Sequence, residues 1–180
     1  IHRNPLNGRN FEYVSEDPIL TGKIGAAQVI GIQEAGSTAT IKHFCANNQE
    51  ASRRFVDSIV SERALREIYL KGFEIAVKEG KARSVMTTYN PVNGIWTAGS
   101  YDLCTTILRK EWGFDGIVMT DWWAEANTEG EKSTRGNKAP MVLAQNDLYM
   151  CVSNSLENPE NDNVKERFEA GEVTRSDLQR

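Results

Sequence analysis

The sequence predicts an α/β fold with parallel strands, because short apolar runs alternate along the chain with helical patterns. Residues 38–41, 84–90 and 117–119 form three such runs, and each leads into polar residues. Short apolar runs of this length are typical of strands buried in a parallel sheet, and their alternation with helices indicates βα units. We count four strand–helix units and a partial one at the N-terminus.

The elements between and after these runs follow from local signals. Pro18 follows Asp17 as a proline in a first helical turn would, which predicts a helix from there. Residues 64–77 and 101–112 carry apolar side chains at helical spacing. We expect a last strand region over 145–150, and a polar loop or a poorly packed helix over 124–140.

Composition and charge exclude several classes of function. The net charge of −4, with no basic run, argues against a nucleic-acid surface, and no run of 18 apolar residues predicts a membrane span. Cys45, Cys104 and Cys151 lack the spacing of metal ligands, and the chain has only two histidines, so we expect no metal and no cofactor. No signal peptide is visible, yet Ile1 does not resemble a natural start, so the location stays open.

The segment 113–123 is the most informative stretch of the chain. A Gly-Phe-Asp-Gly turn leads into the apolar run 117–119, and Asp121 then precedes Trp122 and Trp123. Active sites of α/β proteins lie at the carboxyl edge of the sheet, where such a carboxylate would stand. An indole beside it could stack on the apolar face of a pyranose. The alternative is that Asp121 only caps the next helix.

Three other motifs accompany this segment. They are Asn-Gly-Arg-Asn-Phe-Glu-Tyr at 7–13, Lys-His-Phe at 42–44 with Cys-Ala-Asn-Asn-Gln-Glu after it, and Ser-Val-Met-Thr-Thr-Tyr-Asn at 84–90. Together the four motifs resemble glycoside hydrolase family 3, and specifically its β-glucosidase-like members. The match covers roughly residues 3–123 and resumes at about 141.

The resemblance implies a partial (β/α)8 TIM-type barrel that lacks its first strands, with residues 1–180 forming a single partial domain. Such a barrel normally needs about 250 residues, so the first two units and much of the third strand would lie upstream of Ile1. Members of this type usually take their acid/base glutamate from a second α/β domain, which nothing here matches. We therefore expect a fragment of an enzyme, with weak or no turnover alone.

The resemblance also implies a retaining mechanism on β-glucosides, in which a carboxylate attacks the anomeric carbon and forms a covalent glycosyl-enzyme. Asp121 falls on the nucleophile position, Lys42 and His43 on the residues that hold the sugar, and Arg9 on the arginine that grips its hydroxyls. The residues that border the nucleophile correspond to Met86, Tyr89 and Trp122. Alternatively, Lys42 is a surface lysine, His43 a core histidine, and Arg9 a loop residue paired with an acidic neighbour.

Other functions compete with a β-glucosidase. A β-xylosidase of the same family fits the same residues, whereas Cys-Ala-Asn-Asn after Lys42-His43-Phe44 fits a β-N-acetylhexosaminidase less well. A non-catalytic carbohydrate-binding homologue would keep the pocket, but it would not need Asp121. A third possibility is a structural piece that self-associates or associates with the missing segments through exposed sheet edges.

Overall fold

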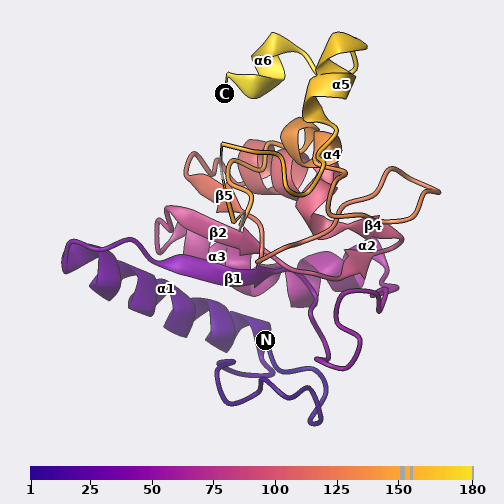
Figure 1. The fold of residues 1–180 in the computed structure, drawn as a ribbon. Coiled ribbons are helices and arrows are strands. Elements are labelled where there is room, and N and C mark those ends of the chain that lie inside the picture. The colour runs from indigo at the N-terminus through magenta and orange to yellow at the C-terminus, as the bar shows by residue number, and fades with distance from the viewer. Residues whose placement is uncertain (151–152, 155, 180) are drawn as a thin grey trace.

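The computed structural model describes residues 1–150, 153–154 and 156–179, and the predicted parallel sheet lies at its centre (Figure 1). Strands β1 (Thr40–Phe44), β2 (Ser84–Thr87) and β5 (Ile117–Met119) pair in the order β1-β2-β5, all parallel. Thr40 pairs with Ser84 and Ser84 with Ile117, so the strands start level with one another. Residues that follow the strands therefore emerge at one edge of the sheet.

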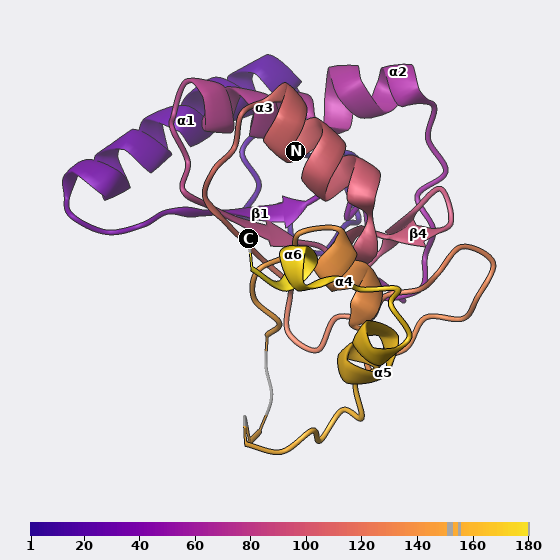
Figure 2. The ribbon, with the colours of Figure 1, turned by 90° about the horizontal axis from the view of Figure 1, so that it is seen from above.

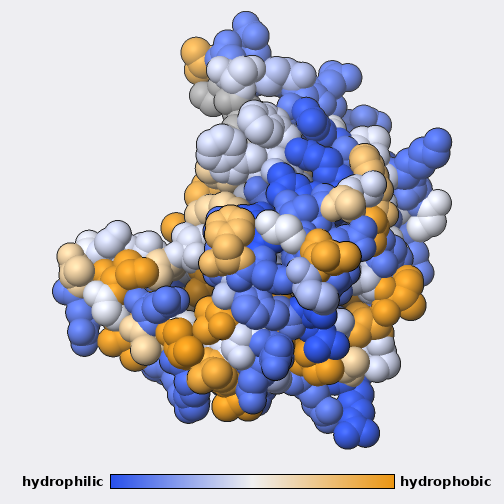
Figure 3. Space-filling model, turned by 90° about the horizontal axis from the view of Figure 1, so that it is seen from below, coloured by the Kyte–Doolittle hydropathy of each residue, from blue (hydrophilic) through white to orange (hydrophobic). Residues whose placement is uncertain are grey.

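Helix α1 (Pro18–Glu34) begins where the sequence predicts it. The carboxylate of Asp17 accepts hydrogen bonds from the backbone N–H groups of Ile19 and Leu20, at 2.7 and 2.9 Å, and thereby satisfies two of the helix's free donors. Several large apolar side chains of α1 remain exposed: Ile19, Leu20, Ile24, Ile30 and Ile32. The face seen from below carries a number of separate hydrophobic areas (Figure 3).

The predicted helix over 64–77 is present as a helical stretch of three parts. They are α2 (Glu62–Ala64), the π-helical η1 (Leu65–Tyr69) and α3 (Lys71–Lys78). After β2, a hairpin of β3 (Pro91–Val92) and β4 (Ile95–Trp96) leads through the 3-10 turn η2 (Thr97–Gly99) into η3 (Asp102–Glu111). This last helix confirms the one expected over 101–112, although it is wound as a π-helix. Figure 2 shows α1, α3 and η3 along one side of the sheet.

The C-terminal third departs from the strand expected over 145–150. Residues 124–138 form loops, as predicted, and α4 (Ala139–Leu143) follows them. Within 145–150 only Leu148 makes a bridge, pairing in parallel with Met119 of β5. The chain continues through α5 (Val164–Glu169) and α6 (Arg175–Leu178). Thus a single bridge, and not a full strand, extends the sheet beyond β5.

The main core lies between the sheet and the helices. Phe44, Val85 and Val118 come from the three strands and are 0% exposed, and Leu70 and Leu108 meet them from the helical side. Burial of such side chains stabilises the fold by roughly 2 kcal/mol each. The core therefore fixes the strands whose ends carry the candidate site. No helix among the described residues is long and apolar enough to cross a membrane.

Candidate active site

The polar residues at the carboxyl ends of the three strands meet around one open cavity of about 550 Å³. β1 contributes residues 42–43, β2 and the turn after it contribute 86 and 89, and the segment after β5 contributes 121–123. The cavity wall includes all seven residues that the sequence singled out: Arg9, Lys42, His43, Met86, Tyr89, Asp121 and Trp122. Parallel strands that run to the same edge of the sheet explain why these distant residues converge.

The carboxylate of Asp121 is held at the base of this arrangement, since the residue is only 8% exposed. Its Oδ1 accepts a hydrogen bond of 2.7 Å from the backbone N–H of Trp122, and its Oδ2 lies 3.5 Å from Nε2 of His43. The described residues directly after Asp121 form turns and loops, and no helix starts there. The interpretation of Asp121 as a helix cap is therefore wrong.

The imidazole of His43 is uncharged. Burial, followed by the positive charges of Arg9, Lys42 and Arg53, lowers its pKa from 6.5 to about 3, and the single carboxylate of Asp121 does not reverse this. Its Nε2 also lies 3.4 Å from Nη1 of Arg9, whereas Nδ1 is buried without a hydrogen-bond partner among the described residues. His43 is thus a buried histidine that lines the cavity.

The two cations of the N-terminal side share one glutamate. Arg9 is hydrogen-bonded to Glu12, and Nζ of Lys42 lies 3.9 Å from the other oxygen of the same carboxylate. The loop pairing considered for Arg9 therefore exists, and the arginine nevertheless lines the cavity. The Lys42 side chain is 44% exposed, so it reaches both the solvent and the cavity.

Tyr89 faces Asp121 from the turn after β2. Burial raises the pKa of its phenol, and the negative charge of Asp121 and a hydrogen bond with it act in the same direction. Arg53 and Arg54 lie against the Tyr89 ring, with guanidinium carbons 4.7 and 4.3 Å from its centroid, and oppose that shift. The phenol therefore stays protonated and can serve as a donor beside the carboxylate.

Two indoles border the open side. The rings of Trp122 and Trp123 are nearly perpendicular, at 84°, with centroids 5.7 Å apart, and their exposed fractions are 49% and 39%. Exposed aromatic faces beside a carboxylate can stack on the C–H face of a sugar ring. Trp123, to which the sequence analysis assigns no role, also belongs to the cavity wall.

Sequence reasoning missed three other residues of the wall: Gly8, Glu50 and Arg53. Nη1 of Arg53 donates to Oε2 of Glu50 at 2.6 Å, so the loop after β1 carries its own ion pair into the cavity. The available signal for the pair was the Glu-Ala-Ser-Arg spacing at 50–53, which follows Lys-His-Phe after the five residues Cys-Ala-Asn-Asn-Gln.

Nothing in the described part of the chain gathers three or more histidine, cysteine or acidic side chains as a metal would require. Cys45 and Cys104 are buried and unpaired. Cys151 lies outside the described residues.

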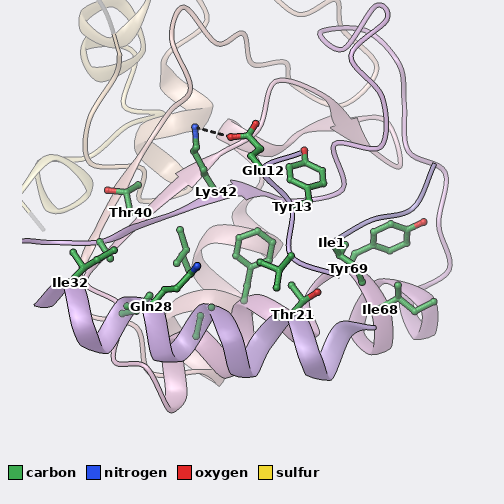
Figure 4. Close-up of a pocket in the computed structure, with 18 residues that line it drawn as sticks. Ile1, Glu12, Tyr13, Thr21, Gln28, Ile32, Thr40, Lys42, Ile68 and Tyr69 are labelled. Atoms are coloured by element: carbon green, nitrogen blue, oxygen red, sulfur yellow. Dashed lines mark ion pairs between the residues drawn. The ribbon is translucent and has the colours of Figure 1, made fainter. Parts of the chain in front are cut away.

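A second cavity of about 300 Å³ lies between α1 and β1 (Figure 4). Its wall includes the apolar side chains of Val29, Ile32 and Ile41, and the Lys42–Glu12 pair stands at its polar end. Asp121 does not line it. The polar cavity around Asp121 is therefore the candidate active site.

The whole chain, residues 1–180, matches the model of the glycosyl hydrolase family 3 N terminal domain. A beta-glucosidase of Ruminococcus albus is 62% identical over 100% of this chain and 19% of its own length. An exo-alpha-(1->6)-L-arabinopyranosidase of Bifidobacterium longum is 52% identical over 69% of this chain and 16% of its own. The chain thus spans under a fifth of the length of these relatives.

Solved structures similar to this chain are also named beta-glucosidases. A beta-glucosidase from Paenibacillus barengoltzii superposes with a TM-score of 0.97 at 60% identity, over 99% of this chain and 20% of its own. Beta-glucosidase 3B from Thermotoga neapolitana, solved in complex with glucose, gives a TM-score of 0.86 at 47% identity, over 99% of this chain and 24% of its own.

Proposed function

Because the chain belongs to glycosyl hydrolase family 3, we propose that it carries the nucleophile and part of the sugar pocket of a retaining β-glucosidase. The observation that carries the proposal is the position of Asp121, a nearly buried carboxylate in the wall of a cavity that the six other residues singled out from the four motifs also line. We further propose that residues 1–180 form one partial domain of (β/α)8 type. The names of the relatives support the choice of a β-glucoside as substrate.

In the proposed reaction, an oxygen of Asp121 attacks the anomeric carbon while the bond from that carbon to the leaving oxygen breaks. The leaving oxygen takes the electron pair and a proton from an acid/base group that we do not assign. Water then cleaves the glycosyl-enzyme. Asp121 must be ionised for the first step, and the donors hydrogen-bonded to it are neutral: the Trp122 N–H and the phenol of Tyr89. The uncharged imidazole of His43 lies 3.5 Å from the same carboxylate.

The other residues of the wall would bind the sugar. Arg9, Lys42 and Arg53 offer charged donors to hydroxyl groups, and such hydrogen bonds are stronger than neutral ones. Trp122 would stack on the ring, and Met86 supplies apolar contact from β2. The charged side chains would thus contact the hydroxyl groups of the sugar, and Trp122 and Met86 would contact its apolar face.

A glycosidase that acts on a pentopyranoside is the second candidate, since a relative 52% identical over 69% of this chain is named an arabinopyranosidase. The same cavity would then hold a ring without the hydroxymethyl group. A β-xylosidase falls within this candidate. Self-association, or association with the missing segments, through exposed sheet edges also stays a prediction.

The experiment is covalent trapping with 2,4-dinitrophenyl 2-deoxy-2-fluoro-β-D-glucoside, whose leaving group departs without acid catalysis. Intact mass and peptide mapping should find one fluoroglucosyl group on Asp121, and Asp121→Asn should remain unlabelled. Label on another residue, or none on the wild type, would overturn the assignment. Faster trapping by the corresponding fluoroxyloside would favour the second candidate.

A further inference from the structure

Arg54 contacts three segments around the candidate site, although it does not line the cavity itself. Its Nη1 donates a hydrogen bond of 2.9 Å to the backbone carbonyl of Trp123, and its guanidinium carbon lies 4.3 Å from the centroid of the Tyr89 ring. Its own backbone carbonyl accepts a hydrogen bond of 3.0 Å from Nε1 of Trp96, on β4. One side chain and its backbone thus join the loops that follow β1, β2 and β5.

The Arg54 side chain contacts the Tyr89 ring and the Trp123 carbonyl, and both of these segments also contact Asp121. Tyr89 is hydrogen-bonded to Asp121, and the N–H of Trp122, one residue before Trp123, donates to Asp121 Oδ1. The backbone of Trp123 has φ +54, a conformation that costs a bulky residue about 1 kcal/mol or more and persists only where its surroundings enforce it. The contact from Arg54 to the Trp123 carbonyl is one such constraint.

The neighbouring Arg53 has a different place. It lines the cavity and pairs with Glu50, so it can contact a bound sugar. Arg54 reaches the same Tyr89 ring from a position that does not line the cavity. Its planar guanidinium can stack on a ring and donate in its own plane at once, which the ammonium of a lysine cannot do.

We propose that Arg54 is a positioning residue that holds Tyr89 and the Trp122–Trp123 segment in the geometry that the nucleophile needs. It would act on the rate of attack by Asp121, and not on the affinity for the sugar. This inference rests on the function proposed above, in which Asp121 attacks the anomeric carbon.

The test compares Arg54→Ala, Arg54→Lys and Arg53→Ala with a control, Arg63→Ala. The Arg63 side chain is 84% exposed and pairs with Glu67 on the helix surface, so its loss changes no contact of the site. Circular dichroism first establishes that each variant is folded. Trapping by the dinitrophenyl fluoroglucoside is then measured over a range of concentrations, and the indole N–H signals are recorded by NMR.

We expect Arg54→Ala to lower the maximal trapping rate by about tenfold, the scale of one lost charged hydrogen bond, with little change in the half-saturating concentration. Arg54→Lys should recover only part of the rate, whereas Arg53→Ala should mainly raise the half-saturating concentration. The control should stay within about twofold of the wild type. The indole signals of Trp122 and Trp123 should move in the Arg54 variants alone.

Equal maximal rates for Arg54→Ala and the control would overturn the inference, and so would a change confined to the half-saturating concentration. If the wild type is not labelled at all, the proposed function fails first. The NMR measurement still decides the role of Arg54 in that case, because unmoved indole signals in Arg54→Ala would show that the residue holds nothing in place.

Discussion

Replacing His43 by glutamine should flatten the pH dependence of the free energy of unfolding. The folded chain holds this imidazole with a pKa of about 3, because burial and the charges of Arg9, Lys42 and Arg53 oppose protonation. In the unfolded chain the same group has its ordinary pKa of 6.5. Below pH 6.5 the unfolded chain binds a proton at this imidazole and the folded chain does not, so the free energy of unfolding falls as the pH falls.

The size of the effect follows from the two pKa values. Between pH 6.5 and the folded value of about 3, each unit of pH costs about 1.4 kcal/mol. At pH 7.5 the contribution is close to zero, and at pH 4.5 it reaches about 2.7 kcal/mol of lost stability. That is a large part of the roughly 5–15 kcal/mol that stabilises an ordinary domain.

The assay is urea unfolding at pH 7.5, 5.5 and 4.5, followed by tryptophan fluorescence. His43→Gln changes packing and hydrogen bonds at every pH, so only the difference in pH dependence between the two proteins is informative. The carboxylates titrate in both proteins and cancel in that difference. The wild type should lose about 2.7 kcal/mol more than the variant between pH 7.5 and 4.5.

Parallel stability curves for the two proteins would refute the reasoning. That result would mean that His43 keeps an ordinary pKa in the folded chain. The imidazole would then be a cation beside Asp121 at mildly acidic pH, and the proposal that only neutral groups contact this carboxylate would be wrong.

Two further predictions concern packing. Gly116→Ala should lower the free energy of unfolding by about 3 kcal/mol, because the new Cβ would lie 2.2 Å from a backbone carbonyl oxygen that cannot move away. Gly31→Ala is the matched control: its Cβ enters open space within α1, so thermal unfolding should show a gain of about 0.5–1 kcal/mol. Burial raises the pKa of the Cys45 and Cys104 thiols, so peptide mapping after iodoacetamide at pH 8 should find both unmodified in the folded chain and modified in urea. Labelling of either thiol in the folded chain at the rate seen in urea would contradict this.

The sequence predicted the sheet and the main helices because each carries a local signal. The runs at 38–41, 84–90 and 117–119 are apolar and short, and each became a parallel strand. The region 145–150 carried a weaker signal, and only Leu148 reached the sheet. The preceding apolar stretch helped to form the short α4 instead, whose buried residues belong to two smaller apolar clusters apart from the main core.

The candidate site was predictable to the extent that strands position it. Side chains at the ends of β1, β2 and β5 converge because parallel strands share one carboxyl edge. Glu50, Arg53 and Arg54 were not predictable in this way, since they lie on the long loop after β1. The path of such a loop depends on contacts between residues far apart in the chain, such as Arg54 with Trp123. No local pattern records those contacts.

Two arginines near Asp121 are paired with glutamates, which bears on the attack proposed for this carboxylate. Arg9 is paired with Glu12, and Arg53 is paired with Glu50. A carboxylate bound directly to a cation would be stabilised as an anion and would attack an anomeric carbon less readily. Asp121 instead receives hydrogen bonds from neutral donors, which orient it without adding a full positive charge. We therefore expect Glu12 and Glu50 to contribute to the proposed reaction by pairing with the two arginines, even if neither glutamate contacts the sugar.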